Sequence, residues 1–124
     1  MRALLAVVLL AAATVAMAQE GFPLDGTWRG ERKGPGGTPV TVVLVMQWDG
    51  HKITGLINPG PKSVPIADAQ LIPDGWKVTL AAKNASGAPI AFAGTIGDLG
   101  EYNRNISGTW TEAGKSYPIR FVRE

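Results

Sequence analysis

The chain of 124 residues contains no cysteine and only one histidine, His51. Without cysteine there are no disulfide bridges, no thiolate nucleophiles and no cysteine-ligated zinc, and a single imidazole excludes metal sites built from several histidines. Neither sign of charge is in large excess, because 12 basic and 10 acidic residues leave a net charge of +2. So small a net charge does not indicate a nucleic-acid partner. We therefore expect no metal, no other cofactor and no nucleic acid.

Long apolar runs are absent outside the first eighteen residues. There, Arg2 gives a short positive start, and sixteen uncharged residues follow it. As a helix these residues would span about 24 Å, which is less than the ~30 Å hydrocarbon core of a bilayer. The run ends in Ala16-Met17-Ala18, which fits the small-x-small rule of signal-peptidase sites.

This N-terminal pattern predicts export. We expect a signal peptide over 1–18, cleavage between Ala18 and Gln19, and a mature domain over 19–124. The protein would then be secreted or periplasmic, with no membrane anchor after cleavage. An uncleaved apolar anchor is the alternative, and the short length of the run argues against it.

The rest of the chain alternates apolar and polar residues in short segments. Val42, Leu44 and Met46, for example, fall on one face, and the turn Asp49-Gly50 follows them. Such alternation indicates half-buried strands, and an Asp-Gly pair is a strong hairpin signal. The expected strands are 26–32, 39–48, 51–58, 63–71, 76–83, 88–96, 105–111 and 116–123.

The short turns between these segments predict an up-and-down antiparallel meander. Eight such strands close into a barrel most economically, because closure removes the exposed strand edges. The segment 63–71 is the weakest strand, because it contains Pro65 and follows Pro59 and Pro61. The predicted fold class is therefore all-β, an eight-stranded up-and-down antiparallel barrel over 19–124.

One local motif recurs along the strands. A glycine stands two residues after an apolar or turn residue and two residues before a large apolar one at Gly26, Gly55, Gly94 and Gly108. Because glycine weakens a strand, its repeated use indicates a shared geometric need, such as bending at barrel corners or close packing beside a ring. The alternative is a backbone that lies close to a ligand.

Parity along the expected strands places all four tryptophans, Trp28, Trp48, Trp76 and Trp110, on the apolar face. Each indole buries about 200 Å², so four of them favour an interior filled by side chains. An eight-stranded barrel has room either for such filling or for one small ligand, and both alternatives stay open. A bound ligand is expected to contact Trp48, Trp76 or Phe92, which lie on the inward face of the middle strands.

Gly26-Thr27-Trp28 resembles the Gly-x-Trp signature that opens barrels of the calycin group, lipocalins included. In that group a basic residue of the last strand packs across the tryptophan. Arg123 shares the parity of Phe121, so the resemblance implies that Gly26, Trp28 and Arg123 close the barrel, with a cation–π pair between the last two. Overall the chain is most similar to small uncharacterised exported bacterial domains with Gly-x-Trp near the start and Gly-Thr-Trp near the end.

Candidate catalytic groups are few. His51 follows the turn Asp49-Gly50 and is expected in solvent at a hairpin tip, and no serine lies in a nucleophile-elbow pattern. The carboxylates lie in turns or on outward parities, where solvated side chains are the norm. Asp68 is the exception, because it shares the parity of Ile66 unless a bulge at Pro65 reverses it. We therefore predict that the protein is not an enzyme and has no catalytic residues.

Two classes of function remain. The first is an exported barrel that binds a small apolar or amphipathic ligand in its interior or at its mouth. The second is a structural or interaction protein of the cell envelope, whose filled barrel presents its surface to another envelope protein. An open apolar cavity of about 300 Å³ or more would favour the first class, and a packed interior would favour the second.

Overall fold

The structure is a computed structural model that describes residues 22–100 and 103–124. The expected signal peptide and its cleavage site lie outside the described residues. A short 3₁₀ helix, η1, joins the first two strands. The elements are β1 (Gly26–Lys33), η1 (Pro35–Gly37), β2 (Pro39–Trp48), β3 (Ile53–Ile57), β4 (Val64–Ile72), β5 (Lys77–Lys83), β6 (Pro89–Gly97), β7 (Asn105–Glu112) and β8 (Lys115–Arg123).

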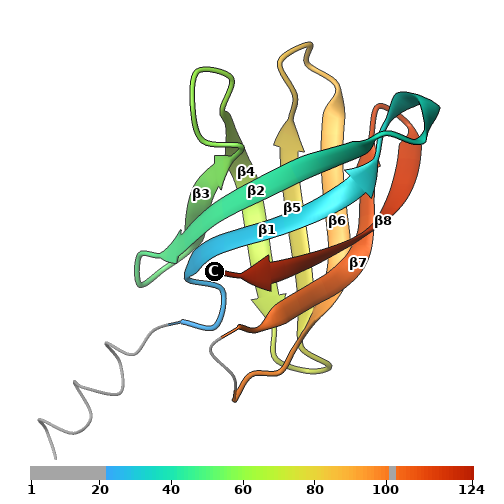
Figure 1. The fold of residues 1–124 in the computed structure, drawn as a ribbon. Coiled ribbons are helices and arrows are strands. Elements are labelled where there is room, and N and C mark those ends of the chain that lie inside the picture. The colour runs from blue at the N-terminus through green and yellow to red at the C-terminus, as the bar shows by residue number, and fades with distance from the viewer. Residues whose placement is uncertain (1–21, 101–102) are drawn as a thin grey trace, which may run out of the picture.

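The eight strands form one closed barrel, in which each strand pairs antiparallel with the next and β8 pairs with β1 (Figure 1). This arrangement confirms the predicted fold class, an all-β up-and-down barrel. The turns β2–β3, β4–β5 and β6–β7 lie at the bottom of Figure 1, and we call this side of the barrel the lower end. The loops β1–β2, β3–β4, β5–β6 and β7–β8 lie at the opposite, upper end.

Aromatic rings fill the middle of the barrel. Phe92, Trp110 and Phe121 are at most 2% exposed, and their ring centroids lie 5.5 to 6.5 Å apart in tilted or edge-to-face arrangements. Aromatic pairs favour such geometries. The centre of the barrel is therefore packed with side chains. Aliphatic residues complete this core: Val42, Leu44, Met46, Ile57, Val78, Leu80, Ile90, Ile96, Ile106 and Ile119.

The segment before β1 closes the lower end. Leu24 and Trp28 are fully buried, and the indole Nε1 of Trp28 donates a 2.9 Å hydrogen bond to the carbonyl oxygen of Leu24. Arg104 Nη1 donates to the carbonyl oxygen of Pro23 at 3.1 Å. These two bonds satisfy backbone acceptors of the segment and hold it against the barrel.

Gly26, Trp28 and Arg123 come together at this end. The register of β1 and β8 places Trp28 opposite Arg123, and a Cβ added to Gly26 would lie 3.3 Å from Arg123 Cδ. Arg123 Nη1 also lies 3.5 Å from the carbonyl oxygen of Asp25, to which it donates a hydrogen bond. The cation–π pair between Arg123 and Trp28, and the contribution of Gly26, Trp28 and Arg123 to barrel closure, stay predictions.

The recurring glycines lie where neighbouring strands approach closely. Gly94 and Gly108 stand opposite each other in β6 and β7. A Cβ on Gly94 would lie 2.5 Å from the carbonyl oxygen of Ser107, and one on Gly108 would lie 2.1 Å from that of Ala93. At Gly55 the distance to a carbonyl oxygen of β2 would be 2.0 Å. A larger residue would push the strands apart, so close packing explains these three glycines.

Two of the four tryptophans do not face the interior as parity predicted. Trp48 is 41% exposed and Trp76 is 39% exposed. Trp48 is the last residue of β2, at the rim of the barrel, and its ring stacks on Phe22 with centroids 4.8 Å apart. Trp76 lies in the β4–β5 turn with a φ of 50°, so the alternation of β5 does not extend to it. Phe92, in contrast, lies in the core as expected.

The expected irregularity near Pro65 is present in β4. The register of β4 against β5 shifts between Ile66 and Asp68, which marks a β-bulge. A bulge inserts one extra residue and reverses the faces beyond it. Asp68 is consequently exposed, and Ala69 points into the core instead.

Burial predicts how unequally the tryptophans stabilise the fold. Trp28→Ala should lower the free energy of unfolding by about 3–5 kcal/mol, because a buried ring and its cavity are lost. Arg123→Ala should cost about 1–2 kcal/mol, and the exposed Trp76→Ala only about 0.5 kcal/mol. Urea unfolding of the three variants measures this order. Equal losses for Trp28→Ala and Trp76→Ala would contradict the described core.

Candidate functional site

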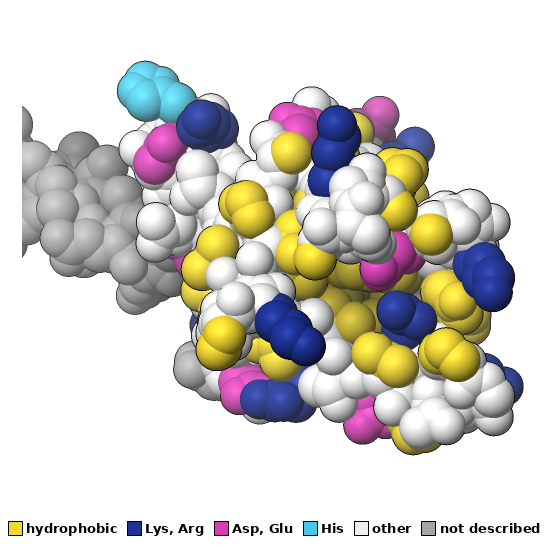
Figure 2. Space-filling model, turned by 90° about the horizontal axis from the view of Figure 1, so that it is seen from above, with side chains coloured by type: hydrophobic (Ala, Val, Ile, Leu, Met, Phe, Trp, Pro, Cys, Tyr) yellow, Lys and Arg dark blue, Asp and Glu magenta, His cyan; other side chains and the backbone are white. Residues whose placement is uncertain are grey.

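The upper end of the barrel is hollow. A cavity of about 190 Å³ opens between its loops, and its apolar walls come mainly from five residues of β2, β3, β4 and β6. Figure 2 looks onto this end and shows hydrophobic side chains at the bottom of the hollow, with basic and acidic ones beside it. These five branched aliphatic residues are Val40, Val42, Ile57, Val64 and Ile90, and Ala85 and Trp110 also line the cavity.

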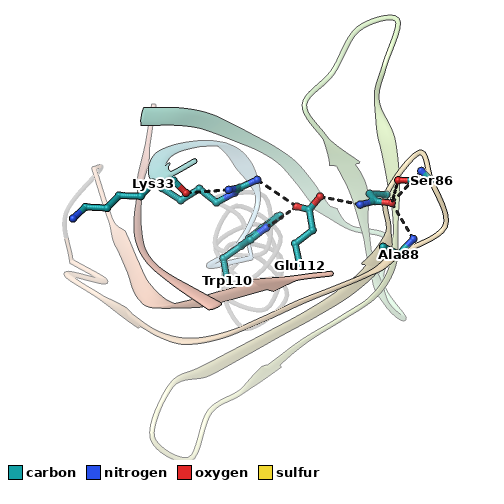
Figure 3. A network of polar contacts seen from close by, with 7 residues as sticks. Lys33, Ser86, Ala88, Trp110 and Glu112 are labelled. Atoms are coloured by element: carbon teal, nitrogen blue, oxygen red, sulfur yellow. Dashed lines mark hydrogen bonds and ion pairs between the residues drawn. The ribbon is translucent and has the colours of Figure 1, made fainter. Parts of the chain in front are cut away.

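Glu112 is the centre of a polar network in this mouth (Figure 3). Its carboxylate accepts hydrogen bonds from Trp110 Nε1 at 3.1 Å and from Asn84 Nδ2 at 3.0 Å. Arg32 Nη2 forms an ion pair with the same carboxylate at 3.7 Å. Trp110 and Glu112 are two residues apart in β7 and so point to the same face. The tryptophan ends the packed core, and the glutamate begins the mouth.

Arg32 is held from several sides. Its guanidinium carbon lies 4.6 Å from the centroid of the Tyr117 ring, and Nη1 donates to the carbonyl oxygen of Lys33 at 3.1 Å. Its side chain is only 14% exposed, and the buried Nε has no hydrogen-bond partner. A buried polar group without a partner is uncommon. The guanidinium of Arg32 lines the cavity, while its Nε–H is enclosed by the protein without a partner.

Asn84 connects the network to the β5–β6 loop. Its Oδ1 accepts hydrogen bonds from the backbone N–H groups of Ser86 at 3.0 Å and Ala88 at 2.9 Å, which is an Asx-type turn. Its Nδ2 is thereby directed to Glu112. One side chain thus fixes both the loop and the carboxylate, so the polar side of the mouth is organised before any ligand arrives.

The carboxyl group of Glu112 is tuned by opposing effects. Burial alone would raise its pKa, but the hydrogen bonds from Asn84 and Trp110 and the charge of Arg32 together lower the pKa below its usual value. Glu112 is consequently ionised at neutral pH. The mouth then holds a carboxylate with three donor groups around it, one of which is the guanidinium of Arg32.

A second hollow lies in the barrel wall between β3 and β4. These strands pair at only two positions, Leu56 with Pro65 and Ile57 with Val64, and they diverge toward the lower end (Figure 1). The resulting side cleft has a volume of about 380 Å³. Its lining residues are Phe22, Trp48, His51, Lys52, Ile53, Asp68, Ala69, Gln70 and Leu71.

Backbone groups of β3 face this side cleft. Asn58 N–H donates to the carbonyl oxygen of Val43 in β2, as does Asp49 N–H to that of Lys52. Residues 52 and 58 therefore direct their backbone toward β2, and the alternation of an antiparallel ladder turns residues 53 and 55 toward β4. Since β4 pairs with β3 only above this point, the cleft has an open strand edge on its β3 side.

The expected ligand-contact residues are not brought together. Trp48 lies in the side cleft, Trp76 in the β4–β5 turn and Phe92 in the packed core. Sequence reasoning missed Arg32 and Glu112, the charged residues of the mouth. One signal was present, because Glu112 continues the inward parity of Trp110.

His51 is exposed at the β2–β3 turn, as expected, and within 22–100 and 103–124 no three histidine or acidic side chains gather as they would around a metal ion. No helix among the described residues is both long and apolar enough to cross a bilayer. Neither a protein-family model, nor a curated protein, nor a solved structure matches the chain.

The lowered pKa of Glu112 predicts a pH-dependent contribution to stability. A depressed folded-state pKa gives stability that is present above the unfolded value of about 4.3 and is lost as pH falls through the folded value. Glu112→Gln should therefore lower the free energy of unfolding by about 1–3 kcal/mol at pH 7, and by less at pH 3. Urea unfolding at both pH values tests this, with the exposed Glu31→Gln as control. An equal loss at both pH values would contradict the described network.

Proposed function

We propose that this chain is a non-enzymatic exported β-barrel whose upper mouth binds a small amphipathic ligand. The observation that carries this function is the placement of a fixed polar network beside apolar walls in one concave site. Binding sites for small molecules combine these two features, with few polar groups to orient the ligand. The resemblance to calycin-type barrels agrees with such a role and stays an expectation.

The size of the mouth limits the ligand. A cavity of about 150 Å³ is large enough to hold benzene, so the 190 Å³ of the mouth suits an apolar group of about six carbons. Phe92, Trp110 and Phe121 fill the barrel beneath it, which leaves no depth for a long chain. A longer ligand would project from the barrel.

The N-terminal sequence supports the part of this proposal that concerns export. The apolar run and the Ala16-Met17-Ala18 site favour a mature protein that begins at Gln19. N-terminal sequencing of secreted or periplasmic material should therefore start at Gln19. Finding Met1 retained in a membrane fraction would contradict both the predicted cleavage and the predicted secreted or periplasmic location.

Ligand binding in the mouth is tested with two matched substitutions on β4. Val64 lines the mouth and Leu71 lines the side cleft, and both are partly buried. Titration with short alcohols, fatty acids and hydrophobic dyes should shift the indole N–H resonance of Trp110. Val64→Trp should abolish this response by filling the mouth, and Leu71→Trp should preserve it.

Two results would overturn this assignment. Loss of binding in Leu71→Trp alone would move the ligand to the side cleft, next to Trp48. No response across the whole panel would favour the alternative, a structural or interaction protein of the cell envelope. The side cleft supports that alternative, because an open strand edge beside the exposed Trp48, which stacks on the half-buried Phe22, is a surface on which a partner strand can add.

A further inference from the structure

Charge is divided between the two ends of the barrel. Each upper loop is bordered by a lysine or contains one, none contains an acidic residue, and Glu112 is the acidic residue that borders one of them. Each lower turn, in contrast, contains an aspartate, and a basic residue lies in or beside the same turn, namely Lys52, Lys77 or Arg104, so the positive excess is confined to the upper end. The upper lysines are Lys33, Lys62, Lys83 and Lys115, and the lower aspartates are Asp49, Asp74 and Asp98. Net charge conceals this division, which becomes visible only when the topology shows which loops share an end.

Inside the mouth the balance is also positive. Glu112 is the acidic residue among those that line the cavity, and Arg32 and Lys62 are the basic ones. The carboxylate is already matched by Asn84, Trp110 and one nitrogen of Arg32. The buried Nε of Arg32 is unmatched. A cleft lined by one sign of charge, with low-dielectric walls, concentrates ligands of the opposite sign.

From this distribution we infer that the ligand of the mouth is an anionic amphiphile. The inference rests on the proposed function and adds the sign of the ligand's polar group. Its apolar part would contact the aliphatic walls, and its anionic group would lie between the guanidinium of Arg32 and the ammonium of Lys62, both of which line the cavity. Charge-assisted bonds to such groups are about twice as strong as neutral ones, so they determine which head group is preferred.

Three probes with the same chain and different head groups test the inference. Hexanoate, hexan-1-ol and hexylamine are titrated into the mature protein at pH 7, and the indole N–H resonance of Trp110 is followed. We expect hexanoate to bind roughly tenfold more tightly than the alcohol, which corresponds to one or two charge-assisted hydrogen bonds, and the amine to bind more weakly than both. The preference for hexanoate should decrease as salt is raised.

Variants of three basic residues show which of them cause the preference for hexanoate. Lys62→Ser changes an exposed loop residue of the upper end and should reduce the preference several-fold, and Arg32→Met should abolish it. Lys77→Ser removes an equally exposed lysine at the lower end and should change nothing. If Arg32→Met fails to fold, Lys62→Ser still decides the question, because its side chain lies outside the core.

The outcomes separate this inference from the proposed function. Equal binding of hexanoate and hexanol, blocked by Val64→Trp, would overturn the anionic preference and leave the mouth site intact. Binding of none of the probes would overturn both. Co-sedimentation with phosphatidylglycerol and phosphatidylcholine vesicles identifies the source of the anion. A response to hexanoate without sedimentation supports a free amphiphile, and Lys62-dependent sedimentation with phosphatidylglycerol alone supports a lipid head group.

Discussion

The pairing of β8 with β1 converts a meander of eight strands into a barrel, and the other features of the structure depend on it. The ladder includes Trp28 opposite Arg123 and Gly30 opposite Phe121. A Cβ on Gly30 would lie 2.6 Å from the carbonyl oxygen of Arg120, so the first and last strands meet as closely as neighbouring ones do. Without this contact both strands would be open edges, and Trp28 would lose one wall of its surroundings.

The interior of a closed eight-stranded barrel is small. In this chain side chains fill part of it, and another part is an open hollow. The rings of Phe92, Trp110 and Phe121 occupy the middle, and Gly94 and Gly108 let two strands approach there. Trp28 and Leu24 close the lower end. The upper end keeps a hollow, and it is there that Arg32, Asn84 and Glu112 meet. The packed middle thus determines how deep the upper hollow is.

Alternation in the sequence was sufficient for the fold class, because an inward residue at every second position is what a half-buried strand requires. It failed at strand ends. Trp48 and Trp76 share the parity of buried residues, but one lies at the rim and the other in a turn with positive φ, where no opposite wall buries them. The mouth could not be predicted for another reason. Arg32 and Glu112 are 80 positions apart, and only the closed topology brings their strand ends to one place.

The two-residue ladder between β3 and β4 has a mechanical consequence. In a closed barrel each strand is hydrogen-bonded to two neighbours, so the barrel should open at the strand pair with the shortest ladder. The pairs β6–β7 and β7–β8 each extend over eight positions. The strands β3 and β4 should therefore separate first, because the contact between them has low local stability. The partly unfolded state would then be a curved sheet with β3 and β4 as its edge strands, in which the aromatic core is still packed.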